Sequence, residues 1–316
     1  MIAPATDRPT ARPTLVDRPA PLSEEDTMTT HATPPTPTST PTRYLDVPGG
    51  RLAYDDTGAG PLVVCVPAVG DVRASYRFLV PQLVTAGYRV ATMDLRGHGD
   101  SSAGWRDYAD TAIAGDVLAL IGALDAGPAI LLGNSYGGAA VAYAAAVDPA
   151  AVRALILLDA FVRDVPQTAL QRLGVRAVAV LGVGAWASYY KSLYKATPPA
   201  DLAAYITGLK ANLREPGRYD ATKAMLYGRH AAVEARLGDI TAPTLVVMGS
   251  KDPDFPDPAA EARRTAEALR GAARVEVAMV AGAGHYPHAE SPAVVGPAVV
   301  AFLAQAGVPG EVSRGA

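Results

Sequence analysis

One short segment, from Ala129 to Val147, constrains the fold of this chain more than any other. An apolar run, Ala129–Leu132, ends in the pattern Gly-x-Ser-x-Gly around Ser135, and an alanine-rich stretch follows at once. We interpret the apolar run as a buried strand and Ser135–Val147 as a helix. A change from strand to helix within so few residues requires a sharp, strained turn with Ser135 at its tip.

The two glycines of this pattern, Gly133 and Gly137, are expected where a side chain would collide with the neighbouring strand or helix. Ser135 is then pushed out above the sheet at a helix N-terminus, where free N–H groups and the helix dipole favour developing negative charge. Ser135 is therefore our candidate nucleophile. The alternative is a serine that only caps the helix.

Composition limits the class of protein. The 316 residues are 49% hydrophobic and carry a net charge of −3, which suits one sizeable α/β domain, or such a core with an inserted lobe. No long Lys/Arg run is present, which argues against nucleic acid or an anionic membrane as partner. The expected partner is a small apolar substrate, and the oligomeric state is left open.

Compartment signals are sparse. The single cysteine, Cys65, lies in an apolar run and is expected to be a small buried hydrophobe. No stretch of about 18 apolar residues could span a bilayer, and no secretory signal is visible at the N-terminus. We therefore expect a cytoplasmic protein.

We expect both ends of the chain to be tails outside the folded core. Residues 1–43 are rich in Pro and Thr and poor in large apolar side chains, so we expect disorder there. Met28 is a second plausible start, and residues 310–316 are a short C-terminal tail. The core is expected over residues 44–165 and 237–309.

Apolar strands alternate with helices along the core. The expected strands are a hairpin of Tyr44–Val47 and Arg51–Asp55, then Leu62–Val66, Arg89–Met93, Ala129–Leu132, Val152–Leu158, Thr244–Met248 and Arg274–Val280. The expected helices are Ser75–Ala86, Thr111–Ala123, Ser135–Val147, Pro258–Leu269 and Ser291–Ala306. Continuous apolar strands between helices indicate a doubly wound, mostly parallel sheet covered on both faces. Ligands of such sheets bind beyond the carboxyl ends of the strands.

The alternation breaks over residues 166–236, which we interpret as an inserted helical cap. Four helical periodicities are expected there: Thr168–Leu181, Ala185–Tyr194, Asp201–Leu213 and Arg218–Ala235. Tyr189 and Tyr190 are candidate walls of an apolar pocket, although packing accounts for most tyrosines of this segment. His230 is a candidate substrate contact or a surface residue.

A serine hydroxyl needs a base, and the base needs a group that orients it. Two further loops follow expected strands: Gly249-Ser250-Lys251-Asp252 and Gly282-Ala283-Gly284-His285. Both leave the same edge of the sheet as Ser135. The three side chains can therefore meet although they are far apart in sequence.

From about Tyr44 to about Ala306 the chain resembles the α/β-hydrolase fold superfamily. The resemblance rests on Asp94-Leu95-Arg96-Gly97-His98-Gly99-x-Ser101, on the turn around Ser135, on Gly249-x-x-Asp252 and on Gly282-x-Gly284-His285, in the family's order Ser, Asp, His. It implies that Ser135 is the nucleophile, His285 the general base and acid, and Asp252 the acid that orients the imidazole.

Other residues compete for these roles. Asp254 and Asp159 are alternative acids, although the Gly-x-x-Asp spacing favours Asp252. His288 is expected to be a polar residue at the start of the last helix, and His98 to make structural hydrogen bonds. The histidines show no spacing typical of a metal site, so we expect neither metal nor cofactor.

The resemblance also implies an oxyanion hole of two backbone N–H groups, those of Tyr136 and Val69. Family members commonly have His-Gly in the loop that contains Val69, whereas this chain has Pro67-Ala68. Proline has no N–H, so the loop departs from the family pattern.

The leading hypothesis is a cofactor-free serine hydrolase that cleaves a small apolar ester or related acyl compound through an acyl-enzyme. The same fold could instead serve carbon–carbon bond hydrolysis, a hydroxynitrile lyase, a perhydrolase or a cofactor-free oxygenase. Dehalogenase and epoxide hydrolase relatives use aspartate as nucleophile, which Ser135 disfavours. A receptor-like homologue that only binds a ligand is a third possibility.

Overall fold

The computed structural model describes residues 41–166 and 168–311. The expectations for the N-terminal tail up to residue 40, for Met28 and for residues 312–316 lie outside this part of the chain. The first described element, β1, begins at Arg43.

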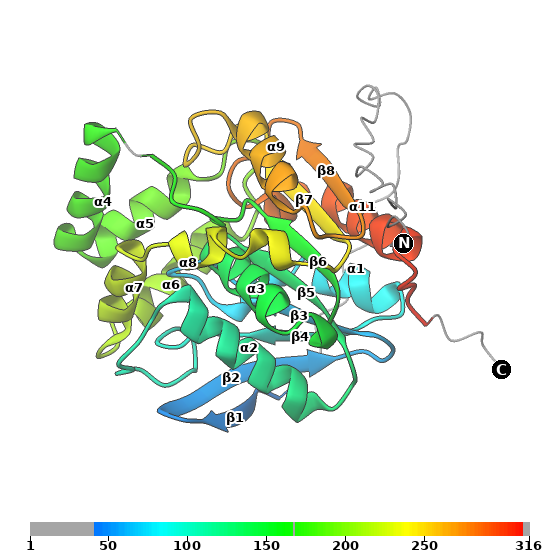
Figure 1. Ribbon diagram of the computed structural model, residues 1–316. Helices are drawn as coiled ribbons and strands as arrows, with labels where there is room; N and C mark the ends of the chain where they lie inside the picture. Colours follow the sequence, from blue (N-terminus) through cyan, green and yellow to red (C-terminus); the bar gives the residue numbers. More distant parts are fainter. Residues whose placement is uncertain (1–40, 167, 312–316) are drawn as a thin grey trace, which may run out of the picture.

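Eight strands form one sheet in the order β1-β2-β4-β3-β5-β6-β7-β8 (Figure 1). Their bounds are β1 Arg43–Val47, β2 Gly50–Thr57, β3 Leu62–Val66, β4 Arg89–Met93, β5 Ala129–Asn134, β6 Val152–Leu158, β7 Thr244–Gly249 and β8 Val275–Val280. The β1–β2 and β2–β4 pairs are antiparallel, and all other neighbours are parallel. The expected α/β fold with a mostly parallel sheet is confirmed.

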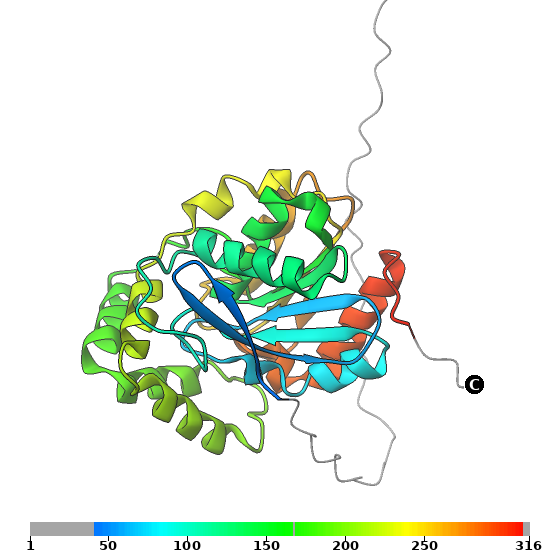
Figure 2. The same cartoon turned by 90° about the horizontal axis from the view of Figure 1, so that it is seen from below.

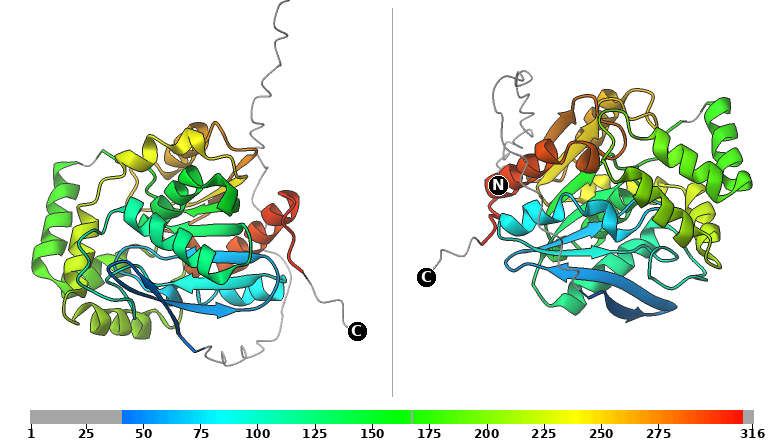
Figure 3. Two further views of the ribbon diagram at one scale, coloured as in Figure 1. Left: turned by 60° about the horizontal axis from the view of Figure 1, so that its bottom comes forward. Right: turned by 180° about the vertical axis from the view of Figure 1, so that it is seen from behind.

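Helices cover both faces of the sheet, as the views from front and back show (Figures 1 and 3). One face carries α2 (Asp110–Leu124), α3 (Tyr136–Val147) and α9 (Pro258–Ala268), and the other carries α1 (Val80–Thr85) and α11 (Pro292–Gln305). Strands β3 and β5 are buried at every residue because both of their faces meet apolar side chains.

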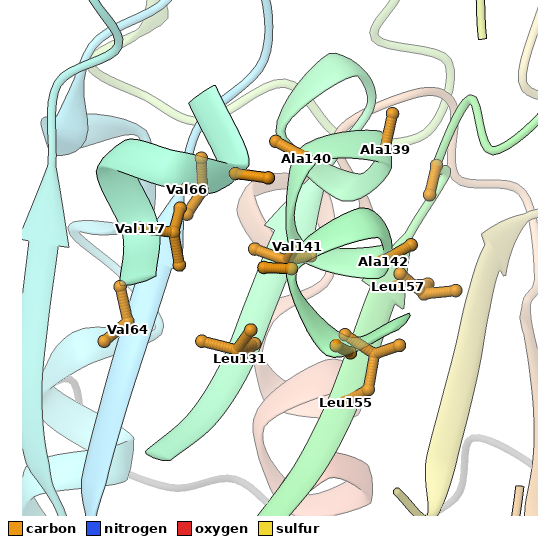
Figure 4. Close-up of a cluster of buried hydrophobic side chains, with 14 of the residues drawn as sticks. Val64, Val66, Val117, Leu131, Ala139, Ala140, Val141, Ala142, Leu155 and Leu157 are labelled. Atoms are coloured by element: carbon orange, nitrogen blue, oxygen red, sulfur yellow. The ribbon is translucent and has the colours of Figure 1, made fainter. Parts of the chain in front are cut away.

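The alanine-rich helix α3 packs closely on the centre of the sheet (Figure 4). Ala139, Ala140 and Ala142 and the larger Val141 lie over Leu131 of β5 and over Leu155 and Leu157 of β6, and all four α3 side chains are fully buried. Small side chains let the helix axis approach the strands, which fixes the position of the turn that precedes it.

Five helices connect β6 to β7 and gather at one end of the molecule (Figures 1 and 2). They are α4 Ala169–Leu181, α5 Val183–Ser192, α6 Leu202–Leu213, α7 Arg218–Leu226 and α8 Ala231–Glu234. Helix α4 begins with a capping box between Thr168 and Gln171. Among the residues with described positions, no helix combines the length and the apolar character that crossing a bilayer requires.

Two segments that we predicted to be single continuous helices are each divided into two in the structure. The segment Ser75–Ala86 forms a 3₁₀ turn, Arg73–Tyr76, and then α1, because Pro81 fits only the first turn of a helix. The segment Arg218–Ala235 breaks into α7 and α8, with Gly228 in the break packed against Tyr136 of α3.

The last expected helix, Ser291–Ala306, is found as one helix and has an additional short helix before it. A short helix, α10 (Pro287–Glu290), precedes α11, which begins at Pro292 rather than at Ser291. Both helices start with proline at their first position, where a missing N–H costs nothing.

Candidate active site

Ser135 lies in the sharp turn between β5 and α3. Its backbone has φ 54° and ψ −119°, a conformation that L-residues rarely adopt and that stores strain. A Cβ atom added at Gly133 would lie 2.5 Å from the carbonyl oxygen of Gly137. A Cβ at Gly137 would lie 2.4 Å from the carbonyl oxygens of Val66 and Pro67, so the tight turn requires both glycines.

The candidate base and acid follow neighbouring strands. Asp252 lies in the loop after β7 and His285 in the loop after β8, and both side chains are buried. The Nδ1 of His285 lies 2.6 Å from Oδ2 of Asp252, so this nitrogen donates to the carboxylate. The ring nitrogen Nε2 is then the one that can exchange a proton with a nucleophile.

The two alternative acids lie close by with different contacts. Oδ2 of Asp254 is 3.8 Å from Nδ1 of His285, and its carboxylate accepts a hydrogen bond from Tyr189 at 2.7 Å. Oδ1 of Asp159 accepts a hydrogen bond from the N–H of Gly249. Of the three carboxylates, Asp252 therefore makes the short hydrogen bond to His285.

These carboxylates, together with burial, determine the pKa values in the site. Burial alone would lower the pKa of His285, but the negative charges of Asp252, Asp254 and Glu290 outweigh it and raise the pKa to about 9. Burial, and then the charge of Asp252, raise the pKa of Asp159 well above its usual value. Burial likewise raises the pKa of Asp254.

Donor atoms of Asp159, Asp252 and His285 all lie within 4.8 Å of one another. Such a group could in principle hold a metal ion. Nδ1 of His285 is already engaged by Asp252 at 2.6 Å, so an ion at this place would have to replace that hydrogen bond. The arrangement fits a hydrogen-bonded acid–base pair as it stands.

A hydrogen bond to His98 holds the loop that follows β3 and contains Val69 and Gly70. The N–H of Gly70 donates to Nε2 of His98 at 3.0 Å, and Nδ1 lies 3.1 Å from the carbonyl oxygen of Arg96. Burial lowers the pKa of His98 to about 4, so its ring is neutral and Nδ1 carries the proton. His98 therefore has the structural hydrogen bonds expected of it, and they position the loop that contains Val69.

Ser135, His285, Tyr136 and Val69 all line one cavity of about 1130 Å³ between the sheet and the cap helices. Of the three expected cap contacts, Tyr189 and His230 line this cavity. Tyr190 does not belong to the described lining. Its side chain is 1% exposed and donates a hydrogen bond to Asp71, since the Tyr190 ring packs inward on Tyr286.

The cap helices are bonded directly to the His285 loop. The carboxylate of Glu290 accepts hydrogen bonds from the N–H groups of Gly284, Lys195 and Ala196, and the N–H of His285 donates to the carbonyl oxygen of Leu193. From the core side, Asn134 donates to the carbonyl oxygen of His285. The segment after α5 therefore helps to set the position of His285.

His288 is not a polar residue at the start of the last helix. It lies in α10, fully buried, with its ring stacked on Tyr76 at 5.0 Å. Burial lowers the pKa of His288 to about 3, so the ring is neutral and packs as an aromatic group.

Three residues near the cavity were not anticipated from the sequence. Asp110 binds Nδ1 of His230, Phe161 lies between the rings of His230 and His285, and Asp71 accepts hydrogen bonds from two cap tyrosines. Asp71 follows an expected strand, which is a usable signal. Asp110 and Phe161 carried no such signal, because their roles depend on contacts across the fold.

This fold and this cluster define a class of enzyme, and comparison with known proteins agrees. The family model described as "Alpha/beta hydrolase family" matches residues 63–298. The chain belongs to the alpha/beta hydrolase family and is an enzyme of that superfamily. The resemblance expected from its motifs is confirmed.

Individual relatives are more distant. Bifunctional epoxide hydrolase 2 of Sus scrofa is 31% identical over 138 residues, which cover 42% of this chain and 25% of that protein, so the chain spans about a quarter of its length. The 2-(acetamidomethylene)succinate hydrolase of Mesorhizobium japonicum is 26% identical over 83% of this chain and 94% of that protein. Among solved structures, a bromoperoxidase from Bacillus anthracis has a TM-score of 0.72 at 21% identity, covering 84% of this chain and 100% of that one, which shows the fold alone.

Proposed function

We propose that this protein is a cofactor-free serine hydrolase that cleaves a small, largely apolar ester or related acyl compound. One observation carries the proposal. The 2.6 Å bond between His285 and Asp252 orients an imidazole in the cavity that Ser135 also lines. A buried carboxylate, an imidazole and a strained serine at a helix N-terminus are the parts that acyl transfer needs.

In this proposal Oγ of Ser135 attacks the substrate carbonyl carbon, and Nε2 of His285 takes the hydroxyl proton. The oxyanion accepts hydrogen bonds from the backbone N–H groups of Tyr136 and Val69. Collapse of this intermediate passes the proton to the leaving alkoxide and leaves an acyl-Ser135. Water, deprotonated by His285, then releases the acid and regenerates the serine.

Steady-state kinetics with a panel of simple esters and thioesters test this proposal. The wild type should hydrolyse at least one of them. Ser135→Ala and His285→Ala should each lower kcat by about 10³-fold or more, with thermal unfolding unchanged within the spread of replicates. Retention of wild-type turnover by Ser135→Ala would contradict the proposal.

The same panel separates the neighbouring chemistries. Adding vinylogous diketones tests carbon–carbon bond hydrolysis with the same three residues. Hydrolysis of none of the panel by folded protein would favour a lyase or oxygenase. Ligand binding that is retained in Ser135→Ala, without turnover in either protein, would favour the receptor-like alternative.

A further inference from the structure

A second histidine–carboxylate pair contributes its histidine, His230, to the lining of the cavity. Nδ1 of His230 lies 3.0 Å from Oδ2 of Asp110, the first residue of α2. Asp110 is 1% exposed, and the other carboxylate oxygen accepts the N–H of Thr111. The pair therefore repeats, in another part of the cavity, the arrangement of His285 on Asp252.

The backbone and the ring of His230 are both held. Its N–H donates to Asp164 at 2.8 Å, and its ring lies edge-on to Tyr136 at 5.3 Å. The break between α7 and α8 puts His230 at this place, since a continuous helix over Arg218–Ala235 would carry it elsewhere. With Nδ1 bonded to Asp110, Nε2 is the atom of this ring that can meet a bound molecule.

The two imidazoles are separated by one aromatic ring. The ring of Phe161 lies 6.0 Å from that of His230 and 5.9 Å from that of His285. Phe161 itself lines the cavity. A molecule of a few carbon atoms, lying along this ring with its carbonyl at Ser135, would reach His230 with its far end.

Charge at this end of the cavity favours an anion. Nδ1 of His230 is paired with the carboxylate of Asp110 at 3.0 Å. Arg176 and Arg229 line the same cavity, the latter paired with Asp164 at 3.3 Å. Asp110 and Asp164 are bonded to the ring and the N–H of His230, and a further acid that lines the cavity, Asp254, lies near His285. The two arginines supply guanidinium donors for a carboxylate beside His230.

We propose that His230, held by Asp110, is a second subsite that binds a carboxylate at the far end of the substrate, so that the substrate is a small acyl compound with a terminal carboxylate. This inference rests on the proposed function for the reacting end of the molecule. His230 acts in binding and orientation, and the bond cleavage stays with Ser135 and His285.

Matched esters test the subsite. The monoethyl esters of succinic, glutaric and adipic acid are compared with ethyl butyrate, valerate and hexanoate, which have the same carbon chains without the charge. The wild type should favour at least one monoester over its neutral partner by about 10- to 100-fold in kcat/KM, the usual range for a hydrogen bond to a charged group. Equal rates, or a preference for the neutral esters, would overturn the inference.

Variants assign the preference to His230. His230→Gln and Asp110→Asn should raise KM for the favoured monoester about 10-fold or more and leave kcat within about 3-fold, with a smaller rise in KM for the neutral ester. Arg214→Gln removes an exposed arginine that does not line the cavity and should keep the preference. Equal losses on both esters in His230→Gln would show a structural role only.

Failure of the proposed function gives a different result. If the wild type hydrolyses no ester, calorimetry of glutarate binding to the wild type and to His230→Gln tests the subsite alone. Binding that His230→Gln weakens about 10-fold would support the subsite without the chemistry. No binding to either protein would overturn it.

Discussion

The carboxyl group of Asp159 lies beside that of Asp252 in the buried interior, at the carboxyl ends of the neighbouring strands β6 and β7. Two adjacent carboxylates do not both ionise easily, and burial raises the pKa of Asp159 well above its usual range. Oδ1 of Asp159 accepts a hydrogen bond from the N–H of Gly249, whereas Oδ2 of Asp252 accepts one from Nδ1 of His285.

This pairing predicts opposite outcomes for two isosteric variants. Asp159→Asn should keep kcat/KM within about 10-fold of the wild type, because an amide retains both a donor and an acceptor. Asp252→Asn should lower kcat by about 10³- to 10⁴-fold, because the imidazolium loses its counter-charge. Ester hydrolysis by both variants measures this, and the reverse order would make Asp159 the orienting acid.

The pH dependence of kcat/KM should reflect the titration of His285. The imidazole must be unprotonated to accept the Ser135 proton, so kcat/KM should rise with pH through a pKa of about 9. The same raised pKa means that the contribution of the charged ring to folding is complete below pH about 6.5 and is lost as pH rises through about 9.

Asp254→Asn tests the origin of that pKa. Its carboxylate lies 3.8 Å from Nδ1 of His285, so removal of the charge should shift the rising limb of kcat/KM to lower pH. Asp220→Asn, at an exposed position of α7, is the matched control and should leave the profile unchanged. A limb that stays in place in Asp254→Asn would show that Asp254 does not contribute to the raised pKa.

Gly137→Ala should damage both stability and turnover. Its Cβ would lie 2.4 Å from the carbonyl oxygens of Val66 and Pro67, so the loop with Val69 must move away from α3. Such overpacking costs about 1–3 kcal/mol, and displaced oxyanion donors typically cost about 10²- to 10³-fold in kcat.

Gly115→Ala is the control for that variant. Gly115 lies in α2, where an added Cβ meets nothing within 4 Å, so alanine should be neutral or stabilise the helix by up to about 1 kcal/mol. Chemical denaturation and ester kinetics on both proteins give the comparison. Wild-type values for Gly137→Ala would contradict the close approach of the turn to the loop.

Tyr190 should matter for stability more than for substrate binding. Its hydroxyl and that of Tyr205 both donate to the buried Asp71, whose pKa burial raises to about 6. Tyr190→Phe should lower the free energy of unfolding by about 1–3 kcal/mol with little change in KM, whereas the half-exposed Tyr44→Phe should change neither. A large rise in KM for Tyr190→Phe would instead indicate that Tyr190 contacts the substrate.

Much of the core could be predicted because its strands are buried on both faces. The runs Leu62–Val66, Arg89–Met93 and Val152–Leu158 have the predicted bounds in the structure, since continuous apolar residues have no other stable environment. Placement of Ser135, Asp252 and His285 at one edge follows from the parallel order of those strands.

Contacts between distant segments could not be predicted in the same way. The break at Gly228 and the burial of His288 depend on Tyr136 and Tyr76, which lie on other elements. Periodicity alone favoured a continuous helix through His230, and nothing local placed Asp110 beside its ring. The proposed subsite at His230 therefore depends on the packing of α2 against the cap, which local sequence does not reveal.

The most direct test of the account is covalent labelling by an organophosphonate ester, followed by intact-mass measurement and peptide mapping. The account predicts that one phosphonyl group is added to the wild type and maps to Ser135, that Ser135→Ala gains none, and that His285→Ala reacts at least about 10²-fold more slowly. Folded wild-type protein that stays unlabelled, or a label that maps to another residue, would contradict the account.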